Sequence, residues 1–169
     1  DGYFLSTNFL SPNGFVHFGD NLIEGGAGDD VIYGEFARYE HSGASRPITV
    51  IAGDSRIDGG EGDDILYGDE ENRTVRGGAD VFVFRHNGGD DIIKDFHGHH
   101  PDLERRDGDR VDLSEFTYLN DISKENFQAF IDDYVIPGEP GSNYIYIDLP
   151  DMKDGVITNA IPHVRIKIE

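Results

Sequence analysis

The sequence contains no cysteine and no tryptophan among its 169 residues, and no apolar run in it is long enough to cross a membrane. Disulfide bonds therefore contribute nothing to the fold. A small domain without disulfides commonly depends on a bound metal instead. The N-terminus also lacks the basic and then apolar pattern of a signal peptide. From its abrupt ends, DGYF and RIKIE, we expect the chain to be part of a longer polypeptide.

Basic residues are scarce as well. The chain has 14 lysine and arginine residues against 34 aspartate and glutamate residues, which gives a formal net charge of −20. Such a charge repels nucleic acids and anionic membrane surfaces, and it attracts cations. Phenylalanine and tyrosine, by contrast, are plentiful and lie in apolar runs such as residues 81–84. The chain can therefore bury a core once its acidic groups are neutralised.

Two nearly identical stretches dominate the first half of the chain: GGAGDDVIY at residues 25–33 and GGEGDDILY at residues 59–67. Both fit the nonapeptide G-G-x-G-x-D-x-U-x, in which U is a large apolar residue. Incomplete copies flank them at residues 16–24, 50–58 and 68–76, and a copy that is two residues short occupies residues 77–82. The recurrence of one short motif predicts a repetitive architecture.

The nonapeptide itself predicts a turn followed by a short strand. Glycine permits positive φ and close backbone approach, so carbonyl groups of the turn can point inward with the aspartate at the sixth position. The apolar residue at the eighth position then enters a narrow core. Two nonapeptides would complete one coil, and successive coils would lie about 4.8 Å apart. We therefore predict an all-β fold, a parallel β-roll (β-solenoid), over residues 16–84.

The spacing of the copies predicts which turns lie above one another. Gly59 and Gly77 are 18 residues apart, which is one coil, whereas Gly25 and Gly59 are 34 residues apart, which is one coil and 16 further residues. We therefore predict an inserted loop at about residues 35–50. With this loop set aside, one column holds the turns at 25–30, 59–64 and 77–80, and the other holds the turns at 16–21, 50–55 and 68–73.

In the first column Asp30 would lie over Asp64, and Asp64 over Asp80. Two unit charges about 5 Å apart repel by roughly 3 kcal/mol at an effective dielectric constant near 20, so this column needs a cation. Oxygen ligands on flexible glycine turns suit Ca²⁺ better than Mg²⁺. We predict two Ca²⁺ sites, one between turns 25–30 and 59–64 and one between turns 59–64 and 77–80. The predicted ligands are the carboxylates of Asp30, Asp64 and Asp80 and carbonyl groups among Gly25, Gly26, Ala27, Gly28, Gly59, Gly60, Glu61, Gly62, Gly77 and Gly78.

These repeats resemble the calcium-binding β-roll of RTX proteins, which Gram-negative bacteria export by type I secretion. The similarity continues downstream. GGADVFVF at residues 77–84 resembles the closing repeat of such rolls. DIIKDF at 91–96, followed by GDRVDLS at 108–114, resembles the segment after the roll in serralysin-type proteases and alginate epimerases. The resemblance implies a calcium-binding module of a larger secreted protein, unfolded in the cytosol, folded outside the cell, and recognised by type I secretion machinery.

Two alternatives stay open at this point. The module could bind a cell-surface glycan, either as an adhesin segment or as a polysaccharide-binding module. It could instead be the support domain of a secreted protease, lyase or epimerase. The chain has no H-E-x-x-H, G-x-S-x-G or phosphate-loop motif. We therefore predict no catalytic residues in this chain and place any activity in a parent domain.

The flanking regions contain no nonapeptides. Residues 1–15 alternate apolar and polar positions and are predicted to add a strand or cap to the open end of the roll. Residues 85–169 are predicted to form a β-sandwich-like lobe that continues the roll. Its expected elements are strands at 91–96, 110–113, 144–149 and 164–168 and a short helix at 123–131 with Ser123 as N-cap. Asp91, Asp95 and Asp109 are candidates for a further Ca²⁺ site, with solvated strand ends as the alternative.

Two other groups contain side chains typical of binding sites. His97, His99 and His100 lie in a polar segment that predicts a surface loop rather than a zinc site, which needs three or four ligands on rigid elements. The inserted loop holds a basic and aromatic group of the kind favoured in recognition surfaces. This group is a candidate for partner binding, with an ordinary surface loop as the alternative: Arg38, Tyr39, His41 and Arg46.

Overall fold

The computed structural model describes residues 8–10, 15–34, 49–69, 75–98, 108–119, 127–153, 156–158 and 164–169. Strands predominate in these residues, with one α-helix, α1 (Phe127–Tyr134), and one short 3-10 helix, η1 (Thr117–Leu119). The predicted all-β character is therefore confirmed in its coarse form. No helix of the described part is long and apolar enough to cross a membrane.

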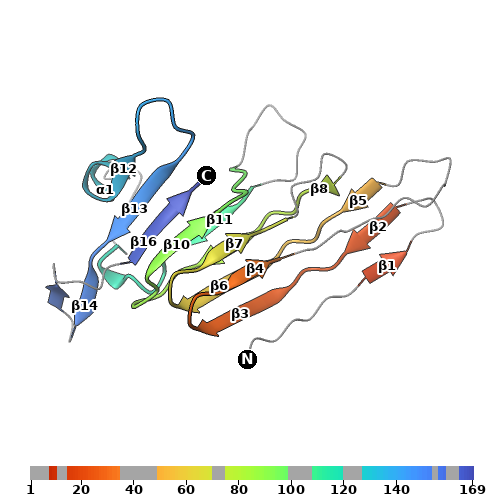
Figure 1. Cartoon of the computed structure of the whole chain (residues 1–169), viewed down its shortest axis with the longest axis horizontal. Coiled ribbons are helices and arrows are strands. Elements are labelled where there is room, and N and C mark those ends of the chain that lie inside the picture. The colour runs from red at the N-terminus through yellow and green to blue at the C-terminus, as the bar shows by residue number, and fades with distance from the viewer. Residues whose placement is uncertain are drawn as a thin grey trace.

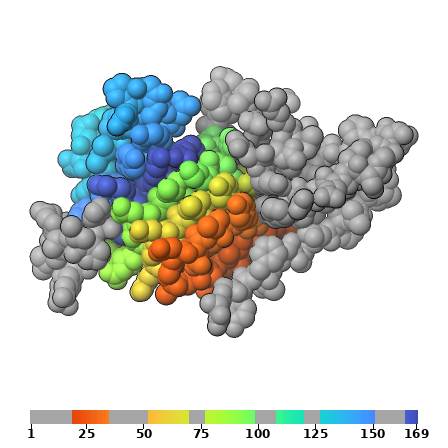
Figure 2. Space-filling model, viewed as in Figure 1, coloured from red at the N-terminus to blue at the C-terminus, as the bar shows by residue number. Residues whose placement is uncertain are grey.

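Three successive segments of chain lie one beside the next, and we call them layers (Figure 1). The first layer consists of β2 (Phe15–Phe18), β3 (Leu22–Ala27) and β4 (Val31–Tyr33). The second consists of β5 (Thr49–Ile51), β6 (Arg56–Glu61) and β7 (Ile65–Tyr67). The third consists of β8 (Val75–Arg76), β9 (Val81–Val83) and β10 (Asp90–Ile93). Corresponding strands of neighbouring layers pair in parallel, and Figure 2 shows the layers as adjacent bands on one face.

The apolar positions of the nonapeptides become the core between two facing sheets. Ile32 and Leu66, at the eighth positions of the two complete copies, are buried and adjacent in the β4–β7 pair. Ile57 and Phe82 hold the same place in the opposite sheet and are fully buried. These alternating strands bury one face and leave the other to solvent, as period-two patterns do. The predicted role of the eighth position is thus confirmed at these residues.

The predicted stacking of the third turn is wrong. In the β6–β9 pair Ile57 lies opposite Phe82, which places the turn at 77–80 over 52–55 and not over 59–64. The turn at 59–64 is instead followed in its column by residues 86–91, because Ile92 pairs with Ile65. The cause is that β8 pairs with β5 at the start of the third layer, so the residues that follow β8 continue in the column of residues 52–57. Val75, at the eighth position of the copy at 68–76, therefore pairs with Val50 and not with Ile57, as a regular copy of the nonapeptide would.

The predicted insertion also extends too far at its C-terminal end. Residues 49 and 50 belong to β5, which pairs with β2, so the strand begins inside the expected loop of 35–50. Residues 35–48 lie outside the described part of the chain. At the N-terminal end, β1 (Asn8–Leu10) pairs antiparallel with β2, consistent with the strand expected in residues 1–15.

The C-terminal half adds strands to the same two sheets. The strand β11 (Arg110–Asp112) pairs in parallel with β9, and β16 (Val164–Ile168) pairs in parallel with β10. Two antiparallel strands then follow, which are β13 (Ile145–Leu149) and β12 (Val135–Pro137). The order β12-β13-β16-β10-β7-β4 makes one six-stranded sheet that includes the repeats. A separate hairpin joins β14 (Asp151–Lys153) to β15 (Val156–Thr158).

The expected C-terminal elements are largely present, with shifted ends. The strand expected at 91–96 runs over 90–93, and the one expected at 110–113 ends at 112. The strand expected at 144–149 begins at 145, and the one at 164–168 is confirmed. The helix ends at Tyr134, three residues later than expected, and Ser123 lies outside the described residues. Ile147, Leu149, Val164 and Ile166 from these strands join the common core.

Candidate metal centre

Aspartates join the layers at the turns that follow β3, β6 and β9. We call the column formed by turns 25–30, 59–64 and 86–91 the first corner. At this corner Asp64 Oδ1 accepts the backbone N–H of Asp30 at 2.8 Å, and Asp91 Oδ1 accepts that of Asp64 at 2.9 Å. Each sixth-position carboxylate thus reaches back to the preceding layer. The stacking of Asp30 with Asp64 agrees with the sequence prediction, whereas Asp91 takes the place expected for Asp80.

The fifth-position aspartates make the reverse connection. Asp29 Oδ1 accepts the backbone N–H of Asp63 at 3.0 Å, and Asp63 Oδ1 accepts that of Asp90 at 2.9 Å. Each of these carboxylates therefore reaches forward to the next layer, from an exposed position. In the D-D pairs the fifth-position aspartate therefore bonds to the next layer, and the sixth-position aspartate bonds to the preceding layer. These bonds fix the register of the turns.

The sixth-position carboxylates also present oxygens that receive no hydrogen bond. The Oδ2 atoms of Asp30 and Asp64 are buried and have no hydrogen-bond partner among the described residues. Burial raises the pKa of Asp64 above its ordinary value, and burial followed by the charge of Asp64 raises the pKa of Asp91 to about 8. A buried carboxylate without a counter-charge is costly. These oxygens therefore fit a bound cation.

Glycine is required where the turns approach one another. A Cβ atom built on Gly25 would lie 2.2 Å from the carbonyl oxygen of Gly59, and one built on Gly59 would lie 2.2 Å from Asp64 Oδ2. Gly26 and Gly60, paired across the layers, have φ values of 109° and 105°. The left-handed region is open to glycine and strained for other residues. The close approach of carbonyl and carboxylate oxygens thus depends on the repeated glycines.

One predicted carbonyl ligand already has a hydrogen-bond donor. The carbonyl oxygen of Glu61 accepts the backbone N–H of Gly28 at 2.7 Å, and Gly62 N–H donates to the Gly88 carbonyl at 2.9 Å. These bonds continue the layer-to-layer contacts through the turn. An ion at this corner would therefore share Glu61 with the backbone ladder.

The second corner is the column formed by turns 18–21, 52–55 and 77–80 together with residues 108–109. Here Asp80 Oδ1 accepts the backbone N–H of Ser55 at 2.8 Å, and Asp109 Oδ1 accepts that of Asp80 at 2.9 Å. Gly77 and Gly78 precede Asp80 in this column. The predicted Ca²⁺ site between turns 59–64 and 77–80 is therefore wrong, because the two turns belong to different corners.

The candidates Asp91, Asp95 and Asp109 do not come together. Asp91 lies near the start of β10, whereas Asp95 lies two residues beyond its end. Asp95 binds the backbone N–H groups of Gly68 and Asp69 at 2.9 and 2.8 Å. The second oxygen of Asp109 accepts the N–H of His97 at 2.7 Å. Asp95 and Asp109 thus belong to the second corner, while Asp91 belongs to the first.

The sequence analysis missed two participants. Asp91 was not assigned to the first corner, although GGDDII at residues 88–93 repeats the second half of the nonapeptide. Asp69 of the second corner, which accepts the N–H of Gly78 at 3.0 Å, carries no such signal. His97 is exposed, and His99 and His100 lie outside the described residues. The candidate partner-binding residues Arg38, Tyr39, His41 and Arg46 lie outside them too.

Within the described part, no group of three or more histidine, aspartate or glutamate side chains is arranged to hold a metal ion by itself. The reason is visible in the hydrogen bonds, since many carboxylate oxygens at both corners accept backbone N–H groups. A cation at either corner would need backbone carbonyl oxygens together with one or two carboxylates. Ca²⁺ accepts such mixed oxygen ligation with six to eight ligands.

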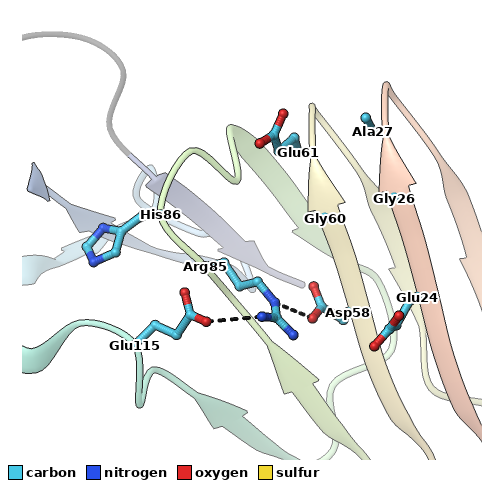
Figure 3. A pocket seen from close by; sticks show the side chains of 9 residues that line it. All are labelled: Glu24, Gly26, Ala27, Asp58, Gly60, Glu61, Arg85, His86 and Glu115. Atoms are coloured by element: carbon cyan, nitrogen blue, oxygen red, sulfur yellow. Dashed lines mark hydrogen bonds and ion pairs between the residues drawn. The ribbon is translucent and has the colours of Figure 1, made fainter. Parts of the chain in front are cut away.

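A separate groove of about 660 Å³ lies on the outer side of the sheet that contains β3, β6 and β9 (Figure 3). Arg85 spans it, donating to Asp58 at 2.5 Å and to Glu115 at 3.0 Å. The bond to Asp58 raises the pKa of the Arg85 guanidinium, which balances a buried carboxylate. Glu24 and Glu61 also line the groove, together with Gly26 and Gly60 of the first corner. The Arg85–Asp58 ion pair thus ties the third layer to the second on the outer side of this sheet.

Comparison with known proteins gives one finding. The family model of the RTX calcium-binding nonapeptide repeat (4 copies) matches residues 17–36 and 52–75. These residues include the turns of Asp30 and Asp64 at the first corner. No curated protein and no solved structure matches the chain. Repeats of this family bind calcium and are not catalytic. The described geometry and the family match agree: this chain contains an RTX calcium-binding repeat module.

Proposed function

We propose that this chain is a calcium-dependent folding module of a larger secreted bacterial protein. Residues 16–84 form a parallel β-roll, residues 1–15 cap its open end, and residues 85–169 close the other end. The parallel register of three layers supports the roll. The observation on which the function rests most is the pair of buried oxygens, Asp30 Oδ2 and Asp64 Oδ2, that have no hydrogen-bond partner among the described residues.

Calcium binds at the first corner between neighbouring layers. One ion lies between turns 25–30 and 59–64, with the Asp30 and Asp64 carboxylates and carbonyl groups of the glycine turns as ligands. The close approach of the Gly59 carbonyl to Gly25 supports this placement. A second ion lies between turns 59–64 and 86–91, where the Asp91 carboxylate contacts the Asp64 backbone. This assignment replaces the site that the sequence placed at residues 77–80.

Ion binding and folding are coupled in this module. Without the ion, negative charge gathers in a low-dielectric interior, and the folded state is disfavoured. Weak extracellular sites have dissociation constants of about 10⁻⁴ to 10⁻³ M, so they stay empty in the cytosol and fill outside the cell. The chain then passes a type I secretion channel unfolded and folds after export. The RTX family match supports this route, since such repeats are typical of extracellular bacterial proteins.

Thermal unfolding tests the proposal. Chelator-stripped protein is heated in the presence of excess chelator, of millimolar Ca²⁺, or of the same concentration of Mg²⁺. At these affinities millimolar Ca²⁺ is about one to ten times the dissociation constant, which stabilises the folded state by about 0.4 to 1.4 kcal/mol for each bound ion. We expect Ca²⁺ to raise the unfolding temperature by many degrees and Mg²⁺ to have little effect. Equal unfolding temperatures in chelator and in Ca²⁺ would contradict calcium-dependent folding.

A further inference from the structure

Asparagine followed by glycine is a dipeptide prone to spontaneous loss of the side-chain amide, and this chain contains it at residues 13–14 and 87–88. The first of these lies outside the described residues. The second lies in the turn at 86–91, which is the third turn of the first corner. Asn87 is exposed and is the one described residue other than glycine with a positive φ, of 62°. A reactive dipeptide therefore lies in the column of turns where we propose that calcium binds.

The reaction of this dipeptide needs only water. The backbone nitrogen of Gly88 forms a bond to Cγ of Asn87 and loses its proton, and the side-chain nitrogen takes up a proton and leaves as ammonia. Water then opens the resulting five-membered imide at one of its two carbonyl carbons. One opening gives aspartate, and the other gives isoaspartate, in which the main chain runs through the side-chain methylene group. Glycine favours the attack because it has no Cβ atom beside the nitrogen.

The folded turn holds the attacking nitrogen in place. Gly88 N–H donates to the Arg85 carbonyl at 3.2 Å and closes a turn over residues 85–88, in which a positive φ at the third residue favours glycine or asparagine. The Gly88 carbonyl accepts the N–H of Gly62 in the preceding layer at 2.9 Å, and Gly88 is buried. Because its N–H and its carbonyl are both bonded, the nitrogen of Gly88 is kept from attacking Asn87 until the turn opens.

Opening of the turn also breaks contacts with the segments on either side. The Gly89 carbonyl accepts the N–H of Arg165 in β16 at 2.9 Å, and Asp91 Oδ1 accepts the N–H of Asp64 at 2.9 Å. Under the proposed function, the second ion of the first corner lies between this turn and the turn of the preceding layer. A ligand that binds only the closed state lowers the population of the open state. Calcium therefore keeps the turn closed.

We propose that Asn87 is a deamidation site whose reaction is suppressed by the calcium-bound fold and released when the ion is lost. This inference rests on the proposed calcium-dependent folding, but it concerns a covalent change in a residue that is not a proposed ligand. The reaction proceeds from the open turn, since local opening exposes groups that the native fold protects. At ten times its dissociation constant, one ion reduces the open population about elevenfold. We therefore expect that ion to slow the loss of Asn87 by about tenfold.

Isoaspartate in place of Asn87 would make the loss of the ion lasting. It adds one atom to the main chain in a turn with little space, where a Cβ atom built on Gly89 would lie 2.5 Å from the Gly62 carbonyl oxygen. The added atom displaces the residues that follow, including Asp91, from the preceding layer. A module left without calcium thus loses the ability to rebuild its second ion site at the first corner. The aspartate product, by contrast, keeps the backbone unchanged and adds one negative charge to the turn.

Peptide mapping by mass spectrometry tests the proposal on the full chain. Three samples are incubated at the same mildly alkaline pH, one in urea with chelator, one in chelator alone and one in saturating Ca²⁺. The map separates the asparagine, aspartate and isoaspartate forms at Asn87 from those at Asn13. We expect equally fast loss of Asn87 in urea and in chelator, and loss that is slower by about tenfold or more in Ca²⁺.

Circular dichroism of the same samples distinguishes the failure of this inference from the failure of the proposed function. Loss of Asn87 in the Ca²⁺-folded sample at the rate found in urea would overturn this inference and leave calcium-dependent folding standing. Loss that is equally slow in chelator and in Ca²⁺, with both samples folded, would overturn the proposed function together with calcium control of Asn87.

A matched variant tests the consequence for calcium binding. Asn87→Gly removes the reactive amide, and glycine adopts the φ of 62° without strain. Parent and variant are aged in chelator and then titrated with Ca²⁺ by calorimetry. We expect the parent chain to lose one bound ion in proportion to its isoaspartate content at Asn87 and the variant to keep its full number of ions. Equal losses in the two chains would overturn the role of Asn87.

Discussion

Asp64 Oδ1 accepts the backbone N–H of Asp30 at 2.8 Å, while Asp64 Oδ2 is buried and has no hydrogen-bond partner among the described residues. One carboxylate therefore has two tasks. Its first oxygen fixes the register of two layers whose residues are 34 positions apart. Its second oxygen lies beside Gly59 and is the proposed ligand of a cation between the layers. Under the proposed function, the same carboxylate is structural without the ion and ligates the ion when it binds.

Replacing this carboxylate separates the two tasks. In Asp64→Asn the amide oxygen can still accept the Asp30 N–H, but the charged ligand oxygen is lost. We expect the Ca²⁺ concentration at half-saturation to rise by about tenfold or more, equivalent to about 1.4 kcal/mol. Asp63→Asn is the matched control, because Asp63 is exposed and contacts the Asp90 N–H. Calorimetric titration that gave equal Ca²⁺ affinity for the two variants would contradict the assignment.

Asp91 tests the corrected stacking. If residues 86–91 follow 59–64 at the first corner, Asp91→Asn should weaken Ca²⁺ binding to the second first-corner ion. Asp90→Asn should have little effect, since Asp90 is exposed and contributes its backbone N–H to Asp63. Calorimetric titration of both variants measures the difference. An Asp91→Asn variant that binds Ca²⁺ like the parent chain would remove Asp91 from the ligand set.

The sequence predicted the stacking of the two complete repeats correctly, but it did not predict the register of the third layer. The complete copies at 25–33 and 59–67 predicted the stacking of Asp30 and Asp64, because their glycines, aspartates and apolar residues all agree. The predicted register failed where the copies degrade: the copy at 68–76 preserves a glycine and a valine, but its last two residues form β8 and pair with β5. The pairing of Ile57 with Phe82 and the hydrogen bond between Ser55 and Asp80 show that 77–80 belongs to the second corner.

The candidate site, too, could be predicted from the sequence only in part. Local residue types predicted the glycine turns and the inward aspartates, since these follow from backbone geometry within nine residues. Contacts between distant segments did not follow from local patterns. The Asp69 contact to Gly78 and the Asp95 contact to Gly68 depend on how links of unequal length bring the layers together. The GGDD sequence at 88–91 was the one local signal that could have placed Asp91.

Gly59 should tolerate no side chain. In Gly59→Ala the new Cβ would lie 2.2 Å from Asp64 Oδ2, so the carboxylate or the turn must move. Overpacking of this kind costs about 1–3 kcal/mol, and here it also displaces a proposed ligand. Urea unfolding in Ca²⁺ should show this loss. Gly98→Ala is the control, because among the described residues its Cβ would meet only Phe96 Cε1, at 3.6 Å. Equal stability of the two variants would contradict the close approach.

The stability of the ion-free fold should depend on pH. Burial raises the pKa of Asp80 and of Asp91 to about 8 and that of Asp109 to about 6, from an ordinary value of 3.8. The folded state then binds more protons than the unfolded state between pH 3.8 and about 8. Stability in chelator is therefore greatest near and below the ordinary pKa and is lost as pH rises through 6 and 8.

The measurement is thermal unfolding in chelator at pH 5 and at pH 8. We expect the higher unfolding temperature at pH 5, where protons neutralise the buried carboxylates that Ca²⁺ would otherwise balance. With saturating Ca²⁺ this advantage should shrink or reverse, because protons compete with the ion for the same oxygens. A higher unfolding temperature at pH 8 in chelator would show that these carboxylates are not buried as described.

The most direct test of the account is far-ultraviolet circular dichroism of chelator-stripped protein during a Ca²⁺ titration, with Mg²⁺ as the control ion. The account predicts a cooperative change from an unfolded to a β-rich spectrum with Ca²⁺ and no such change with Mg²⁺ at the same concentration. A spectrum that is already β-rich in chelator at neutral pH and does not change on addition of Ca²⁺ would contradict it. The fold would then stand without the ion, and the aspartate columns would serve only as hydrogen-bonding ladders between layers.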